Sequence, residues 1–81
     1  MAKMSIIYSI NAEQDNLKQI FEELKNIGAK DLRYIEVGFG IKKIEALFIV
    51  DENQSLDDLE NKISSINGVN SIDIVEMNRM G

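Results

Sequence analysis

The groups that could carry chemistry in this chain are carboxylates, Lys, Arg, Tyr and Ser, because the sequence contains neither His nor Cys. The absence of imidazole and thiol excludes a Ser-His-Asp triad, a Cys-His pair, a disulfide framework and a zinc-thiolate site. Acid-base or nucleophilic catalysis would have to proceed without its commonest side chains. The composition therefore favours a binding or regulatory protein over an enzyme.

The most unusual local sequence is Gly38-Phe39-Gly40, in which a large aromatic residue stands between two glycines. Glycines are common in tight turns, so Phe39 is expected at the tip of a hairpin. An aromatic residue on a loop often anchors a protein interface, but a ring that folds back onto the sheet edge fits the pattern equally well. The spacing is not a phosphate-binding fingerprint, because neither a third glycine nor a helix follows it.

Two consecutive lysines, Lys42 and Lys43, follow this turn. On a strand their side chains point to opposite faces, so they cannot form one basic patch by themselves and are expected to be solvated. Arg79 is the only basic residue after Lys62. Taken alone, it is a charge near the end of the sequence with no evident role.

An acidic group in the second half of the sequence consists of Asp51, Glu52, Asp57 and Asp58. The run lacks the Gly and the closing Glu of a calcium-binding loop. Two of the four carboxylates are explained as charges at the N-terminus of a helix. We therefore expect no metal site here.

The charge balance limits the kinds of partner. Fourteen acidic and nine basic residues give a net charge of −5, which repels phosphate backbones and anionic lipid. The longest apolar run, residues 46–50, is far shorter than the roughly 20 residues of a membrane-spanning helix, and no long apolar segment of a secretory signal is present. We expect a cytoplasmic protein that contacts neither a membrane nor nucleic acid directly.

Six regular elements must position these groups, and hydrophobic periodicity predicts each of them. Strands are expected at residues 3–11, 30–37, 41–50 and 69–77, and helices from residue 13 or 15 to Gly28 and from about Ser55 to residues 67–68. The second helix starts with the capping-box sequence Ser55-Leu56-Asp57-Asp58. Asp58 and Lys62 have the spacing of a helical ion pair.

The order β-α-β-β-α-β predicts an α+β protein of ferredoxin-like topology, with two helices on one face of a four-stranded antiparallel sheet. No Pro, linker or repeat divides the sequence, so residues 1–81 are expected to form one domain. The first and third strands would be central. The second face of the sheet would be open and apolar, a surface that could meet a partner, with four projecting residues: Ile7, Leu47, Ile49 and Val75.

Three stretches of the sequence resemble the guanine-nucleotide exchange domain of the translation elongation factor 1-beta family, which serves elongation factor 1-alpha in archaea and eukaryotes. They are VGFGIKKIEALFIV at residues 37–50, SLDDLENKI at residues 55–63 and GVNSIDIVEMNRM at residues 68–80. The aromatic-glycine-basic run, the helix start and the basic C-terminal end occur together and in the right order. The short length is similar to that of archaeal members without an appended N-terminal domain, and residues 1–36 match only in pattern.

The resemblance implies a ferredoxin-like fold and a factor that promotes GDP release from elongation factor 1-alpha so that GTP can rebind. Arg79 would occupy the position of a near-terminal basic residue, a Lys in eukaryotic members, which intrudes at the magnesium and phosphate site of the GTPase. Phe39 would occupy the position of a loop aromatic that contacts the GTPase away from the nucleotide. With their neighbours they form the expected partner-binding set: Phe39, Lys42, Lys43, Asn78, Arg79 and Met80. Such a factor would need no cofactor and no catalytic group, and it is expected to be monomeric when free.

Arg79 departs from the eukaryotic pattern, because a planar guanidinium need not enter a metal site as a compact ammonium does. It could compete with magnesium, or it could pair with phosphate or with a carboxylate ligand of the metal. Alternating strand directions also place the hairpin and the end of the last strand at opposite ends of the sheet. The two contacts are therefore expected to grip separate regions of the partner.

Two other functions are compatible with the same fold. A small-molecule-binding regulatory module is the main alternative, but it rests on topology alone and gives Phe39 and Arg79 no joint task. An acylphosphatase-like enzyme would need an anion-binding loop with Arg after the first strand, where the sequence has Asn11-Ala12-Glu13. The enzyme is therefore disfavoured.

Overall fold

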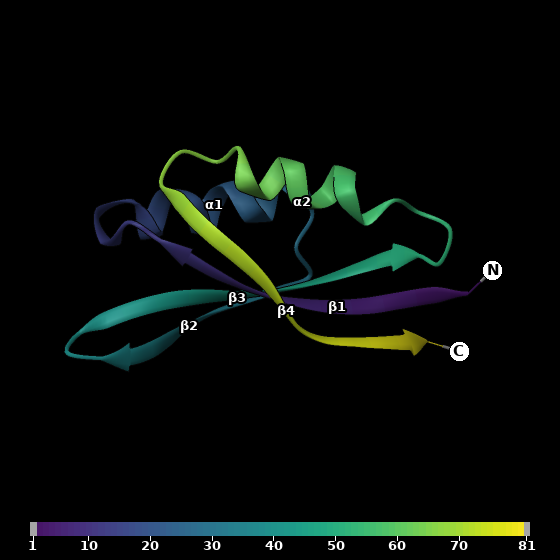
Figure 1. The fold of residues 1–81 in the computed structure, drawn as a ribbon, viewed down its shortest axis with the longest axis horizontal. Coiled ribbons are helices and arrows are strands. Elements are labelled where there is room, and N and C mark those ends of the chain that lie inside the picture. The colour runs from purple at the N-terminus through teal and green to yellow at the C-terminus, as the bar shows by residue number, and fades with distance from the viewer. Residues whose placement is uncertain (1, 81) are drawn as a thin grey trace.

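The computed structural model describes residues 2–80, which form one four-stranded antiparallel sheet covered on one face by two helices (Figure 1). The elements in chain order are β1 (Lys3–Ala12), a short 3-10 helix η1 (Gln14–Asn16), α1 (Leu17–Ile27), β2 (Asp31–Gly38), β3 (Ile41–Asp51), α2 (Leu56–Ser64) and β4 (Val69–Met80). The strand order is β2-β3-β1-β4, with β1 and β3 in the centre. The predicted ferredoxin-like α+β fold is confirmed. No helix within residues 2–80 is long and apolar enough to cross a membrane.

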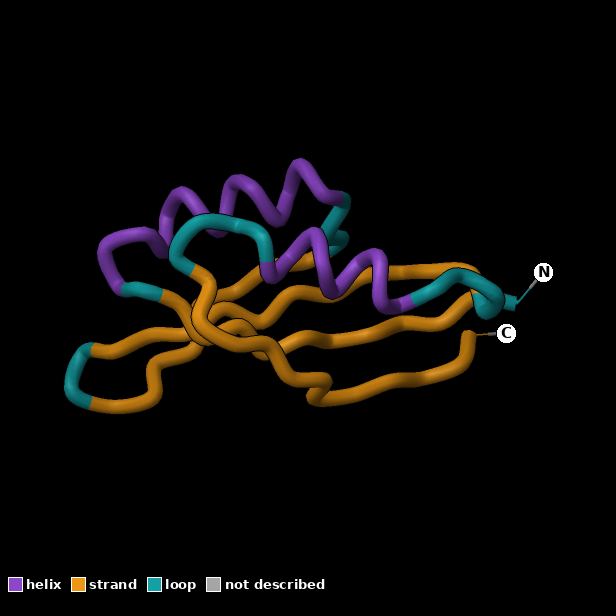
Figure 2. Tube along the Cα trace, turned by 45° about the horizontal axis from the view of Figure 1, so that its top comes forward, coloured by secondary structure: helices purple, strands orange, loops and turns teal. Residues whose placement is uncertain are grey.

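The core lies between the helices and one face of the sheet (Figure 2). Alternation along β1 buries Ile6, Tyr8 and Ile10 completely, as strand geometry requires of residues two apart. The apolar stripes predicted for the helices are confirmed, because Leu24 of α1 and Ile63 of α2 are also fully buried. These contacts hold the two helices against the middle of the sheet.

Tyr8, a fully buried core residue, has a polar group that reaches a charged partner. Its hydroxyl donates a hydrogen bond to Glu60 Oε2 at 3.1 Å, on α2. Burial, reinforced by this bond and by the negative charge of Glu60, raises the pKa of Tyr8 well above its ordinary value. The bond therefore ties the central strand to the second helix while the phenol stays protonated.

The start of α2 differs from the capping-box prediction. Ser55 is the N-cap residue, with an extended backbone, but its side chain makes no capping hydrogen bond. The spacing-based pair between Asp58 and Lys62 is also absent from the ion pairs of the described residues. Both features concern exposed groups, which water can solvate as well as a neighbour can, so the buried stripe and the first-turn acids suffice to start the helix.

Strand β4 is longer than predicted, because it continues past residue 77 to Met80. Asn78, Arg79 and Met80 are paired with the start of β1 and do not form a free tail. Sequence periodicity could not show this, since these residues bury little apolar surface and are held by backbone pairing to a strand at the other end of the chain. Gly81 lies outside the described residues.

The second face of the sheet is left uncovered by the helices, as expected (Figure 1). Ile7 pairs with Leu47, and both are partly buried on the face opposite to the fully buried Ile6. Val75 lies at a register shift between β1 and β4, where it has no paired residue, and it is 54% exposed. Apolar side chains therefore lie on the open face at Ile7 and Leu47.

Candidate functional site

The turn between β2 and β3 displays Phe39 completely. The residue is 104% exposed and has a positive φ of 54°, between Gly38 at 118° and Gly40 at 76°. A positive φ is uncommon for any residue other than glycine, and here two glycines share the tight turn with it. The alternative in which the ring folds onto the sheet edge is wrong.

The residues on either side of this turn are also apolar and exposed, Val37 by 56% and Ile41 by 48%. Together with Phe39 they form the hairpin tip, defined here as residues 37–41. Water is a poor environment for three such side chains, and grouped exposed apolar residues mark interaction surfaces. The hairpin tip is therefore the strongest candidate for an anchoring contact on this end of the molecule.

The two lysines after the tip lie on opposite faces of β3, as predicted. The Lys42 ammonium lies 5.9 Å from the centroid of the Tyr34 ring, which itself stacks on Phe21 of α1 at 4.8 Å. Lys43 pairs in register with Ile35, and its side chain lies on the open face of the sheet. The structure brings Lys42 to the helix side of the hairpin and keeps Lys43 apart from it.

Arg79 lies at the other end of the sheet, on the edge strand β4, opposite Met4 of β1. Its Nη2 is 3.2 Å from Oε1 of Glu52, just beyond β3, so the ion pair reaches across the end of β1. The Arg79 side chain is 70% exposed and that of Glu52 is 36% exposed. The guanidinium is thus oriented by one carboxylate, and most of the side chain is exposed to solvent.

The neighbours of Arg79 do not join it on one surface. Asn78 pairs with Ser5 and Met80 with Lys3, whereas Arg79 pairs with Met4 between them. Side chains alternate between the faces of a strand, so Asn78 and Met80 point away from the guanidinium. Of the three terminal residues predicted to bind a partner, only Arg79 shares the helix-covered face of the sheet.

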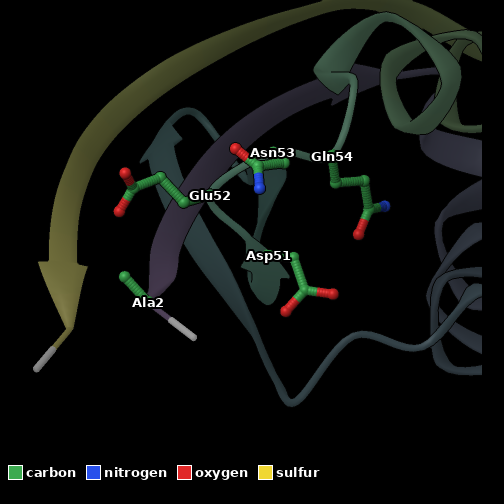
Figure 3. A pocket seen from close by; sticks show the side chains of 5 residues that line it. All are labelled: Ala2, Asp51, Glu52, Asn53 and Gln54. Carbon is green, nitrogen blue, oxygen red and sulfur yellow. The ribbon is translucent and has the colours of Figure 1, made fainter.

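The turn that carries Glu52 borders a surface hollow lined by Ala2, Asp51, Glu52, Asn53 and Gln54 (Figure 3). The backbone N–H of Glu52 donates to Ala2 O at 3.1 Å, which fixes the turn to the start of β1. Figure 3 shows the Glu52 carboxylate directed toward β4 and the Asp51 carboxylate directed elsewhere. Sequence analysis missed Glu52 as the partner of Arg79, because only strand register brings the two together.

The carboxylates of the described residues form no cluster that could hold a metal ion. Within residues 2–80, no group of three or more acidic side chains lies close enough together to hold a cation. Glu52 is paired with a cation of its own chain, and Asp57 and Asp58 lie in the first turn of α2. The acidic run therefore supplies one oriented counter-ion and helix-terminal charges.

The hairpin tip and Arg79 lie at opposite ends of the long axis of the molecule, which extends 42 Å (Figure 1). The hairpin lies at one end of the sheet, and β4 finishes at the other, where β1 begins. This confirms the separation expected from alternating strand directions. A partner that contacts both sites must span most of the length of the sheet.

Comparison with known proteins gives two matches over most of this chain. The sequence model of the EF-1 guanine nucleotide exchange domain matches residues 5–80. Elongation factor 1-beta of Thermoplasma acidophilum is 39% identical over 64 residues, which is 78% of this chain and 70% of that protein. The match to the exchange-domain model includes the hairpin and extends over the sheet and helices described above.

Proposed function

Because the chain belongs to the EF-1 guanine nucleotide exchange domain family, we propose that the two ends of its sheet divide the work of exchange between them. The protein is a guanine-nucleotide exchange factor that promotes GDP release from elongation factor 1-alpha so that GTP can rebind. In our proposal the hairpin tip anchors the partner, and Arg79 acts where the nucleotide is held. The alternative of a small-molecule-binding regulatory module rested on topology alone and is not favoured by this family membership.

The observation that carries the proposal for Arg79 is an exposed guanidinium on a strand end that backbone pairing holds in place. GDP in a GTPase is held by magnesium and by donors around its phosphates, so a cation brought to that site competes for the same anionic oxygens. A guanidinium offers a planar fork that matches phosphate or carboxylate oxygens. We therefore propose that the Arg79 guanidinium binds either a phosphate of the nucleotide or a carboxylate ligand of the partner's magnesium ion.

The ion pair with Glu52 has to open before Arg79 can act in this way. It is a single contact at 3.2 Å between partly exposed side chains, so water competes for both groups. Pairs of this kind are worth about 0–1 kcal/mol. The partner's anionic site needs to offer only slightly more than Glu52 does for the guanidinium to change partner.

The hairpin tip contributes affinity and no chemistry. Phe39 with Val37 and Ile41 presents an apolar surface, in which Phe39 is completely exposed and the other two side chains are about half exposed. Its burial against the partner would supply the binding energy that the exchange step draws on. An exchange factor needs no catalytic acid or base, since it acts by binding the nucleotide-free state better than the loaded state.

The remaining features of the proposal concern the context of the protein. Residues 1–81 would work as one exchange domain, monomeric when free, in the cytoplasm where translation takes place. The partner is elongation factor 1-alpha, in its GDP-bound and nucleotide-free states. The single core shared by both helices and all four strands supports the proposal that the described part of the chain works as one unit.

The experiment is release of a fluorescent GDP from elongation factor 1-alpha in the presence of sub-stoichiometric protein. We expect Arg79→Ala to lower the maximal release rate by about tenfold or more, because the lost interaction is a charge-assisted one. Point substitution is preferred to truncation, since removing residues 78–80 would also remove pairing with β1.

Arg33→Ala is a matched control, because Arg33 also pairs with a glutamate, Glu45, at 3.3 Å and is 65% exposed. It lies on the other edge strand, β2, away from Arg79, and its replacement should leave the rate unchanged. Release that the wild-type protein does not accelerate would reject the exchange function in this chain. Equal losses in the two arginine variants would remove the special role of Arg79.

A further inference from the structure

We propose that Gln14 is a positioning residue for exchange, whose side-chain amide replaces a missing strand at the base of the β2–β3 hairpin and thereby fixes the direction of Phe39. The proposal rests on the function proposed above, in which the hairpin tip anchors the partner. It concerns the end of the molecule farthest from Arg79 (Figure 1).

The base of the hairpin has only two strands. Pairing between β1 and β3 ends at Ile10 and Ile44, whereas pairing between β2 and β3 continues to Gly38 and Ile41. A two-stranded ribbon is marginally stable in water, and the register shift between Glu36 and Gly38 interrupts this one further. Between Ile41 and Lys43, the edge of β3 that faces β1 therefore has no paired strand.

Gln14 fills this position with one side chain. The backbone N–H of Lys42 donates to Gln14 Oε1 at 2.9 Å, and Gln14 Nε2 donates to Lys42 O at 2.9 Å. The same Nε2 also donates to Ala12 O at 3.2 Å. Gln14 therefore satisfies both backbone groups of Lys42, as the next residue pair of a continued β1 would.

The hydrogen bonds also determine the orientation of the amide. Rotating it by half a turn would bring Nε2 against the Lys42 N–H, donor against donor, and Oε1 against carbonyl oxygens. A glutamine has the acceptor, the two donors and the length that this arrangement uses. A carboxylate of the same length would keep the acceptor and lose both donors.

Gln14 is itself held from two directions. It is the first residue of η1, and the adjacent Glu13 donates its backbone N–H to Gly68 O at 2.8 Å. Asn16 N–H in turn donates to Glu13 O at 3.0 Å. The amide thus connects the hairpin to a segment already fixed to the loop before β4.

The distance from Lys42 to the tip makes this contact important for Phe39. Three residues of strand cover about 10 Å, so a swing of about 15° at Lys42 would move the ring by about 2.5 Å. Binding sites tolerate displacements of only about 0.5 Å without loss. A hairpin that must be ordered during binding costs affinity that a fixed hairpin keeps.

The test is a titration of GDP release with wild-type protein, Gln14→Ala, Gln14→Glu and the control Gln19→Ala, an exposed glutamine on α1. We expect both Gln14 variants to raise the half-saturating concentration by about 5- to 10-fold, as the loss of one or two hydrogen bonds implies. The maximal rate at saturation should stay within about twofold of wild type, because Arg79 is untouched. Gln19→Ala should match wild type in both quantities.

A double variant shows whether Gln14 acts through the ring. Gln14→Ala should change the half-saturating concentration by less than about twofold in a Phe39→Ala background, because the group it positions is already gone. A similar rise in the half-saturating concentration in both backgrounds would overturn the proposal. An unchanged titration for Gln14→Ala would also overturn it if Phe39→Ala by itself raises the half-saturating concentration. If Phe39→Ala is itself unimpaired, the anchoring role in the proposed function fails instead.

Amide hydrogen exchange separates local loosening from general destabilisation. The Lys42 N–H should lose protection in Gln14→Ala while the core amide of Ile6 keeps it, which would support a local role at the hairpin base. Equal loss of protection at both amides would mean that the fold as a whole is weakened, and the proposal would then be rejected.

Discussion

Replacing Glu52 by Gln is expected to make this protein a faster exchange factor at low salt. Glu52 is the carboxylate that holds Arg79 in the free protein, at 3.2 Å. The substitution keeps the size of the side chain and removes its charge, so it releases the guanidinium without altering the turn. The prediction follows from treating Glu52 as a competitor of the partner's anionic site.

The magnitude follows from the geometry of the pair. The contact is single, and the two side chains are 70% and 36% exposed, so the pair is worth about 0.2–1 kcal/mol. At the upper value, about five of every six molecules hold Arg79 in the paired state. Glu52→Gln should therefore raise kcat/KM for GDP release by up to about sixfold, and it should lower the free energy of unfolding by less than about 1 kcal/mol.

The assay is GDP release measured at about 20 mM and 300 mM salt, because added salt screens exposed charges. The gain should shrink at the higher salt. Asp51→Asn is the matched control, since it removes the same charge from the adjacent residue, whose carboxylate is directed away from β4 (Figure 3). A gain in both variants would indicate a general charge effect, and a slower Glu52→Gln protein would show that Glu52 assists Arg79 instead of competing with it.

Two further predictions concern stability. Phe39→Ala should leave the melting temperature within about 2 °C of wild type while weakening the partner, because the ring is completely exposed, and a large fall in melting temperature would contradict its role as a free anchor. Tyr8→Phe should cost about 1–2 kcal/mol near pH 8 through loss of the bond to Glu60. The pKa of Tyr8 in the folded protein is raised above its unfolded value of 10.0. The stability that Tyr8 contributes is therefore complete below pH 10, and it falls by about 1.4 kcal/mol for each pH unit above 10. Denaturant unfolding at pH 8, 10 and 11 should therefore show the difference between the two proteins narrowing, and a constant difference would contradict this account.

Much of the fold could be predicted because it depends on burial. The stripe containing Ile20 and Leu24 on α1 and the alternation of Ile44, Ala46 and Phe48 on β3 are set by the periods of helix and strand, and both were confirmed. The exposed groups gave poorer predictions. A Ser side chain at a solvated helix start need not form its capping bond, and β4 continued to Met80 because β1 offered a backbone partner.

Periodicity and residue spacing predict the six main elements and the apolar sides on which they pack, and the family resemblance points to Phe39 and Arg79 as candidate contact residues. The contacts that hold those two residues in place are visible in the folded chain and not in the sequence. Arg79 meets Glu52 across the end of β1, and Gln14 meets Lys42 at a separation of 28 positions. Such polar contacts leave no periodic signal, because their formation depends on strand register and on where one strand stops pairing with the next.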